Sequence, residues 1–400
     1  MRWRKTQLLV LFFATLLMSS CWDASELSDL SIISGVGIDK GGNDGSYKVS
    51  FQIINPSEVS ADEDGVQQGS TSTVVISSVG NSIFEAVRKA SEQLSRRIYS
   101  PHTNLVVIGE DFAREEGLNK ALDWFERDHA FRTNIPMVIA RGSTAEEVLL
   151  VQSPFERVSA KKIDETIKTS GAVWGETKEV EIQDVIINQL RMGRENTISG
   201  IKIVGDLSEA VEGEGLGKSK PPAILQAAGM AMFRDGHLHS WLDHKAARGT
   251  NWIDNAIEST VVTLPCHNDE KIAIEIIQSN AQKEAKLTDQ ETLEINLTIF
   301  AEGNIGEVNC HIDLTVIENI HKVEKQLEDE IRSEALEAIQ ISQEEQIDIF
   351  GFGEEVHRKY PNQWKMLKDQ WNEHFAELQV NVQVNTFIRR TGSRNNPFIE

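Results

Sequence analysis

The residue with the clearest chemical assignment is Cys21, which ends a short apolar segment. Three basic residues near the start precede an apolar run over residues 8–18, and residues 16–21 read Leu-Leu-Met-Ser-Ser-Cys. This pattern is typical of a secretory signal peptide, which has a basic start, an apolar middle too short to span a bilayer comfortably, and small residues before its cleavage site. A cysteine at the cut resembles the lipobox of bacterial lipoproteins, in which the thiol receives a diacylglyceryl group. We therefore predict a lipoprotein signal peptide over residues 1–20 and lipid attachment at Cys21, the alternative being an ordinary signal peptide that ends near a cysteine.

Two other groups of residues invite a ligand-binding interpretation, but neither has the pattern that its chemistry requires. Residues 213–219, Gly-Glu-Gly-Leu-Gly-Lys-Ser, are one residue short of a phosphate-binding loop, and a Pro-Pro pair follows where a helix should begin. A metal site would draw on His237, His239 and His244 with Asp243, yet these residues lie at a predicted hairpin where polar side chains are common. We expect solvated polar residues at both places. We assign no catalytic residue, no metal and no cofactor.

Three further features have structural interpretations. The separation of Cys266 and Cys310 neither requires nor forbids a disulfide, and we expect two unpaired thiols, with the disulfide as the alternative. The Trp and Phe side chains over residues 364–375 follow helical spacing, which favours core packing over a ligand-binding face. The acidic residues over 324–337 are interpreted as a solvated helix face.

The charge balance restricts the partners of the protein. The chain holds 40 basic and 62 acidic residues, and loss of residues 1–20 would leave 37 basic residues and a formal charge of −25. This sign argues against nucleic acid and against electrostatic adhesion to anionic lipid, because both attract basic surfaces. Membrane attachment should therefore come from the lipid, and a two-chain diacylglyceryl anchor holds more firmly than a single acyl chain.

The elements that must position these residues follow from the apolar pattern. Strands and helices alternate up to about residue 200, which predicts a sheet with some parallel pairing under helical cover. Residues 229–242 read as a hairpin around an Arg-Asp-Gly turn. The longest predicted helix covers residues 318–341, and a second, aromatic helix covers residues 363–378. Residues 378–388 then alternate between apolar and amide side chains as a strand.

These elements predict an α+β protein with mixed sheets covered by helices, and with a long helix and antiparallel strands in the C-terminal part. We divide the mature chain into three domains, over residues 21–200, 201–285 and 286–400. Residues 207–222 are rich in Gly, Glu, Lys and Ser and are the best candidate for a flexible segment near a boundary.

Several of these segments, in order, resemble one family of proteins. The segments are Cys21-Trp22-Asp23, Gly35 to Asp39, Ser100-Pro101-His102, Val106 to Glu110, Met137 to Ala140, Gly229 to Phe233, Trp241-Leu242, Arg248-Gly249, Asp348 to Gly351, Tyr360-Pro361, Trp364, Trp371 and Phe375. Together they are similar to the GerAC-like spore germination family, the C-subunit lipoproteins of bacterial spore nutrient germinant receptors.

The resemblance implies a three-domain α+β lipoprotein on the outer face of the spore inner membrane, tethered through diacylglyceryl and palmitate groups at Cys21. Its partners would be two polytopic germinant-receptor subunits, of the A type and the B type, that respond to small nutrients. No chemistry of its own is implied, so its role in spore germination would be structural or coupling.

An extracytoplasmic solute-binding lipoprotein of a transporter is the alternative. It should show two similar lobes of parallel strands. An enzyme would need a catalytic set, and we identify none in the sequence.

Overall fold

A computed structural model of the protein describes Trp3 and residues 30–43, 45–55, 72–153, 156–211, 219–266, 270–288 and 292–392. The predicted signal peptide with Cys21, and residues 213–218 of the loop resembling a phosphate-binding motif, lie outside the described residues. None of the helices in the described ranges is long and apolar enough to cross a membrane.

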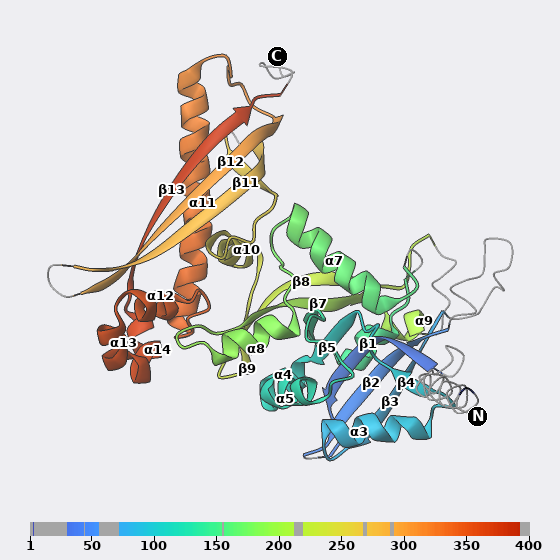
Figure 1. Ribbon diagram of the computed structural model, residues 1–400. Coiled ribbons are helices and arrows are strands. Elements are labelled where there is room, and N and C mark those ends of the chain that lie inside the picture. The colour runs from blue at the N-terminus through green and yellow to red at the C-terminus, as the bar shows by residue number, and fades with distance from the viewer. Residues whose placement is uncertain are drawn as a thin grey trace.

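The N-terminal part of the described chain forms a nine-stranded sheet, in the order β3-β2-β1-β5-β6-β7-β8-β9, with β4 paired to β1 (Figure 1). The strands are β1 (Leu30–Lys40), β2 (Tyr47–Ile54), β3 (Thr73–Gly80), β4 (Arg97–Tyr99), β5 (Leu105–Gly109), β6 (Met137–Ala140), β7 (Thr197–Gly205), β8 (Ala223–Arg234) and β9 (His237–Leu242). Pairing is parallel from β1 through β5 and β6 to β7, and antiparallel in β1-β2-β3 and β7-β8-β9. The prediction of a mixed sheet is therefore confirmed.

Helices cover both faces of this sheet. One buried core joins the sheet to α3 (Ile83–Lys89), α4 (Glu110–Glu115), α5 (Asn119–Arg127) and α8 (Ile182–Leu190). Another joins it to α6 (Ala145–Leu150) and α7 (Ser159–Val173). The side chain of Thr144 caps α6 in a capping box with Glu147. The short helices η2 (Ala90–Glu92) and α9 (Leu207–Val211) complete this part.

A second sheet has the order β10-β11-β12-β13, formed by β10 (Thr260–Pro265), β11 (Lys271–Leu287), β12 (Leu293–Val308) and β13 (Gln379–Arg390). The first three strands are antiparallel, but β13 runs parallel to β12, so the expectation of antiparallel strands is wrong for this pair. The reason is the helical crossover: α11 (Ile317–Glu344) follows β12 and carries the chain back, so β13 starts from the same end as β12.

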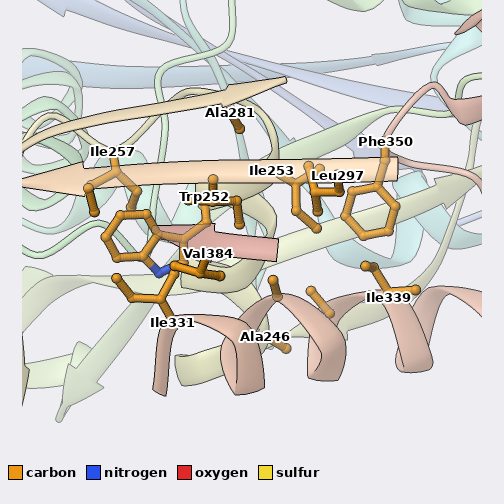
Figure 2. Close-up of a cluster of buried hydrophobic side chains, with 14 of the residues drawn as sticks. Ala246, Trp252, Ile253, Ile257, Ala281, Leu297, Ile331, Ile339, Phe350 and Val384 are labelled. Carbon is orange, nitrogen blue, oxygen red and sulfur yellow. The ribbon is translucent and has the colours of Figure 1, made fainter. Parts of the chain in front are cut away.

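A third buried core lies between this sheet and two helices, α10 (His244–Ile253) and α11 (Figure 1). Figure 2 shows Trp252 of α10 between Ile331 of α11 and the strands that carry Leu297 and Val384. Trp252 is fully buried. The alternating apolar residues of β11 and β12 point into this core, because successive side chains of a strand face opposite sides.

The aromatic segment near the C-terminus is broken where a single helix was predicted. Instead of one helix over residues 363–378, the chain forms α13 (Pro361–Leu367), η3 (Lys368–Gln370) and α14 (Trp371–Ala376). A separate helix, α12 (Phe352–Lys359), precedes them. The tighter turn of η3 separates the two aromatic helices, and the rings of Trp364 and Trp371 pack edge to face with centroids 5.2 Å apart. Both side chains are buried, as is Phe375, so the interpretation as core packing is confirmed.

Cys266 and Cys310 form a disulfide, with Cα atoms 6.4 Å apart, and the expectation of two unpaired thiols is wrong. The cysteines meet because β10 and β12 both flank β11. Pro265 pairs with Lys271, and Val308 pairs with the neighbouring Ile272, so the chain leaves both outer strands at the same end of β11.

The three-domain division stays a prediction. Its inner boundaries, at residues 200 and 285, lie within β7 and β11 respectively.

Candidate functional site at the junction of the two sheets

The histidines considered as metal ligands do not converge on one point. Nε2 of His239 lies 2.7 Å from Oε2 of Glu345, while Asp243 forms a two-point ion pair with Arg141. The side chain of His244 is 87% exposed. Within the ranges that the structure describes, no group of three or more His, Cys, Asp or Glu side chains could hold a metal ion.

The densest cluster of buried charge surrounds Asp254, the residue that follows α10. Its carboxylate lies 2.8 Å from Nζ of Lys178, 3.2 Å from Nη2 of Arg194 and 3.5 Å from Nζ of Lys283. Burial alone would raise the pKa of Asp254, but the three cations lower it to about 2. One carboxylate therefore contacts cations from both halves of the fold: Lys178 and Arg194 flank α8, and Lys283 belongs to β11.

A second buried ion pair joins α10 to α11. The guanidinium of Arg248 makes a two-point contact with Glu334, with 2.8 Å between Nε and Oε2, and Nε1 of Trp252 donates to the same oxygen at 2.8 Å. Glu334 is fully buried, so its interpretation as part of a solvated face is wrong. The helices approach closely at Gly249, where an added Cβ would lie 2.0 Å from the carbonyl oxygen of Glu334.

Asp348 organises the chain between α11 and α12. Its carboxylate accepts hydrogen bonds from the backbone N–H groups of Phe352 at 3.1 Å and Gly353 at 2.7 Å, and from Nε1 of Trp371 at 2.9 Å. Burial raises the pKa of Asp348, and these hydrogen bonds oppose that rise. The backbone carbonyl of Asp348 accepts from N–H of Glu195, which connects this turn to the first sheet.

A polar cavity of about 610 Å³ lies beside these contacts. The segment between α8 and β7 forms one wall, and the turn at Asp348 with α13, η3 and α14 forms the other. Two N–H groups of lining residues, Nε of Arg194 and Nε1 of Trp364, are buried without a hydrogen-bond partner. Burial raises the pKa of Glu195, also in the lining, to about 7.

A larger cavity of about 830 Å³ lies between α3 and α5, with Phe84, Lys120 and Trp124 among its lining residues. We place the candidate site at the polar cavity because Asp348, Arg194 and Glu195 line it. The arrangement offers polar groups to a ligand, including the two N–H groups that have no partner among the described residues. It does not assemble a nucleophile with a general base, and we assign it no catalytic role.

The sequence interpretation missed the charged residues of this junction, although two left a signal. Lys283 stands between Ala281 and Ala285 on the inward face of an alternating strand, and Glu334 lies three residues after Ile331 on the apolar stripe of the long helix. Asp254 left no comparable signal, because its partners are far away in the sequence.

Comparisons with known proteins place the chain among spore germination proteins. The model described as spore germination protein N-terminal domain matches residues 23–203, and the model described as spore germination B3/GerAC like, C-terminal, matches residues 228–392. Spore germination protein KC of Bacillus subtilis (strain 168) is 35% identical over 399 residues, covering 98% of each chain. Spore germination protein B3 of the same organism is 24% identical over 388 residues, covering 96% of this chain and 97% of the relative.

A solved structure supports the same fold. The crystal structure of the GerBC protein matches with a TM-score of 0.53 and 17% sequence identity, over 92% of this chain and 100% of that chain. At this identity the similarity establishes the fold alone.

Proposed function

Because this chain belongs to the GerAC-like family of spore germination proteins, we propose that it is the C subunit of a spore nutrient germinant receptor. The observation that carries the proposal is the extent of the match: two family models together cover residues 23–203 and 228–392, and one spore germination relative is 35% identical along 98% of the chain. The two sheets differ in strand order and pairing, whereas a solute-binding lipoprotein should have two similar parallel lobes.

The subunit is anchored by lipid in this proposal. The lipobox-like segment 16–21 supports cleavage before Cys21 and attachment of a diacylglyceryl group to its thiol. The anchor holds the acidic body on the outer face of the spore inner membrane. It thereby raises the concentration of that body beside two polytopic partners, the A-type and B-type subunits.

The body acts as a coupling element, and the junction of the two sheets supports this role. Asp254 holds cations from both halves of the fold, and the backbone contact between Glu195 and Asp348 crosses the same junction. A displacement of one half by a membrane partner would therefore change the distances between buried charges of the two halves. Loss of an ion partner there is energetically costly, so the junction resists sliding.

A cross-linked pull-down tests the proposal. The full-length protein is captured from detergent-solubilised spore inner membranes, and every co-purifying chain is identified by mass spectrometry. We expect two polytopic proteins. Capture of a transporter permease with an ATPase would contradict the proposal and would move the search for a small ligand onto this chain.

The anchor has its own test in Cys21→Ala, which removes the acceptor thiol. We expect the variant to remain as an uncleaved precursor or to leave the membrane fraction. Unchanged processing and membrane partitioning would refute lipid attachment at this residue. Ser20→Ala is the matched control, because it alters a neighbouring small residue and keeps the thiol.

A further inference from the structure

The cavity of about 830 Å³ lies away from the junction of the two sheets. It is bounded by α3 and α5, which pack in the same core against the first sheet (Figure 1). It shares no lining residue with the polar cavity. Its volume falls within the ~300–1,000 Å³ that is usual for sites of small molecules. The fold therefore has room for a ligand at a second, separate place.

Aromatic side chains form much of the wall of this cavity. Tyr47 of β2, Phe84 of α3 and Trp124 of α5 all line it. Tyr47 and Trp124 are buried, whereas Phe84 is 50% exposed. Pockets for small molecules are lined mainly by apolar and aromatic side chains, together with a few polar groups that fix the orientation of the ligand. Three rings from three separate elements give the cavity this character.

The polar groups of the wall leave one cation without a counter-charge. Besides Tyr47, the charged and titratable side chains that line the cavity are Arg88, Lys120, Asp123, Arg127, Asp128 and His129. Nζ of Lys120 lies 2.5 Å from Oε2 of Glu116. Nε of Arg127 lies 2.8 Å from Oδ1 of Asp123. Oδ1 of Asp128 accepts a hydrogen bond from the backbone N–H of Ala130 at 3.1 Å. Arg88 forms no ion pair within the described part of the chain.

The guanidinium of Arg88 is held over an aromatic ring instead. Its Cζ lies 4.8 Å from the centroid of the ring of Phe84, four residues earlier on α3. A guanidinium stacked on a ring is pre-oriented, and its planar fork of N–H donors matches the two oxygens of a carboxylate. Such charge-assisted contacts are among the stronger hydrogen bonds in proteins. The cavity thus places an unpaired cation beside an exposed ring.

A second donor in the wall also has no partner. Nε1 of Trp124 is buried and forms no hydrogen bond within the described ranges. The side chain of Trp124 is 5% exposed, and its ring packs against those of Phe125 and Phe131, with centroids 4.4 Å and 4.9 Å away. The large majority of buried polar groups are hydrogen-bonded, so an unpaired N–H group in a cavity wall is an exception. An oxygen atom of a ligand would supply the missing acceptor.

We propose that this cavity binds a small aromatic carboxylate. The aromatic wall takes the ring of the ligand, and Arg88 takes its carboxylate. Three cations and two carboxylates of the protein line the cavity, so an anionic ligand is favoured over an ammonium ion. A wholly apolar ligand would gain nothing from Arg88. The proposal goes beyond the receptor role and rests on this cavity alone, so it can fail without affecting that role.

Photo-cross-linking of the full-length protein in detergent micelles tests the proposal. The probes are 4-benzoylbenzoate, its neutral amide and a trimethylammonium analogue, which share one photoreactive aromatic body and differ in charge. The labelled fraction is measured by intact mass against probe concentration, and the labelled peptides are mapped by mass spectrometry.

We expect saturable labelling within residues 81–89 or 119–129, which carry most of the cavity wall. The half-saturation concentration should be about tenfold lower, or more, for the carboxylate than for either analogue, because only the carboxylate forms a charge-assisted contact with Arg88. Labelling that does not saturate, that maps elsewhere, or that has the same half-saturation concentration for all three probes would overturn the proposal.

Two variants and a matched control assign the contacts. Arg88→Gln should raise the half-saturation concentration of the carboxylate about tenfold and change that of the amide less than about twofold. Phe84→Ala removes the exposed ring and should weaken all three probes about threefold to tenfold. Lys89→Gln is the control, because Nζ of Lys89 is paired with Oε1 of Glu85 at 2.7 Å and Lys89 does not line the cavity. It should bind the carboxylate as the unaltered chain does.

Labelling by the neutral amide shows whether a variant keeps its fold, because the amide still needs the aromatic wall. Equal weakening of the carboxylate by Arg88→Gln and Lys89→Gln would mean that surface charge in general attracts the probe. Unchanged binding of the carboxylate by Arg88→Gln would mean that this guanidinium does not contact it. Either result would refute the assignment.

Discussion

Substitution of Asp254 by Asn is the most direct test of the junction. The exchange keeps the size of the side chain and removes the one negative charge shared by Lys178, Arg194 and Lys283. Because Asp254 is almost fully buried, water cannot replace that charge, and three cations are left facing a neutral amide.

Two arguments give the size of the effect. The pKa of Asp254 is lowered from 3.8 to about 2, which corresponds to about 2.5 kcal/mol of stabilisation at neutral pH at ~1.36 kcal/mol per pKa unit. Breaking a buried ion pair by removing one partner costs about 3–5 kcal/mol. We therefore expect Asp254→Asn to lower the free energy of unfolding by about 2.5–5 kcal/mol at pH 7.

The effect also has a definite pH dependence. The folded-state pKa of Asp254 lies below its ordinary value of 3.8, so its stabilisation is present above that value and is lost as the pH falls towards 2. The difference in free energy of unfolding between the unaltered protein and the variant should therefore shrink as the pH falls from about 5 to about 2.

Urea unfolding followed by tryptophan fluorescence measures both quantities, since Trp174 lies four residues before Lys178 and Trp252 lies two residues before Asp254. Asp369→Asn is the matched control: its side chain is 84% exposed, and the change should stay within about 0.5 kcal/mol. A loss below about 0.5 kcal/mol for Asp254→Asn at pH 7 would refute the reasoning, because it would mean that the three cations do not depend on this carboxylate.

Three further predictions concern other parts of the fold. Burial raises the pKa of Glu195 from 4.5 to about 7, so its contribution to stability is lost as the pH rises through this range. Glu195→Gln should therefore melt higher than the unaltered chain at pH 8, and equally at about pH 4, below the unfolded-state pKa. Cys310→Ser opens a disulfide that spans 44 residues and should lower the free energy of unfolding by about 2–4 kcal/mol. A reductant should lower the melting temperature of the unaltered chain but not that of the variant. Trp364→Ala removes a side chain that is 3% exposed, and should lower the free energy of unfolding in urea by about 3–5 kcal/mol. A melting temperature within a degree of the unaltered chain would show that Trp364 contributes little to the core.

Much of the local structure could be predicted because it depends on local patterns. The long helix, predicted over residues 318–341, forms as Ile317–Glu344, since its apolar stripe repeats with the helical period. The hairpin over residues 229–242 forms around Asp235 and Gly236, both with positive φ, as the turn residues indicate. These features are encoded by residues that are neighbours in the sequence.

The features that were missed depend on partners far along the chain. Alternation in residues 378–388 identifies the inward face of β13 but carries no information on strand direction, so the parallel pairing with β12 was not foreseen. Likewise, the burial of Glu334 depends on Arg248, 86 residues earlier. The charged residues of the candidate site belong to this class, which is why the site emerged only from the structure.

The late position of β13 in the chain has a consequence for how the protein matures. Along its length β13 completes the hydrogen bonds of β12, and its residues Val380, Val382 and Val384 help to close the core over α11. Until that strand is synthesised, β12 presents a long unpaired edge, which is the kind of surface that recruits strands from other chains. Folding of the second sheet therefore waits for the synthesis of β13. A chain stalled before residue 379 is exposed to aggregation and proteolysis even though every earlier element is complete.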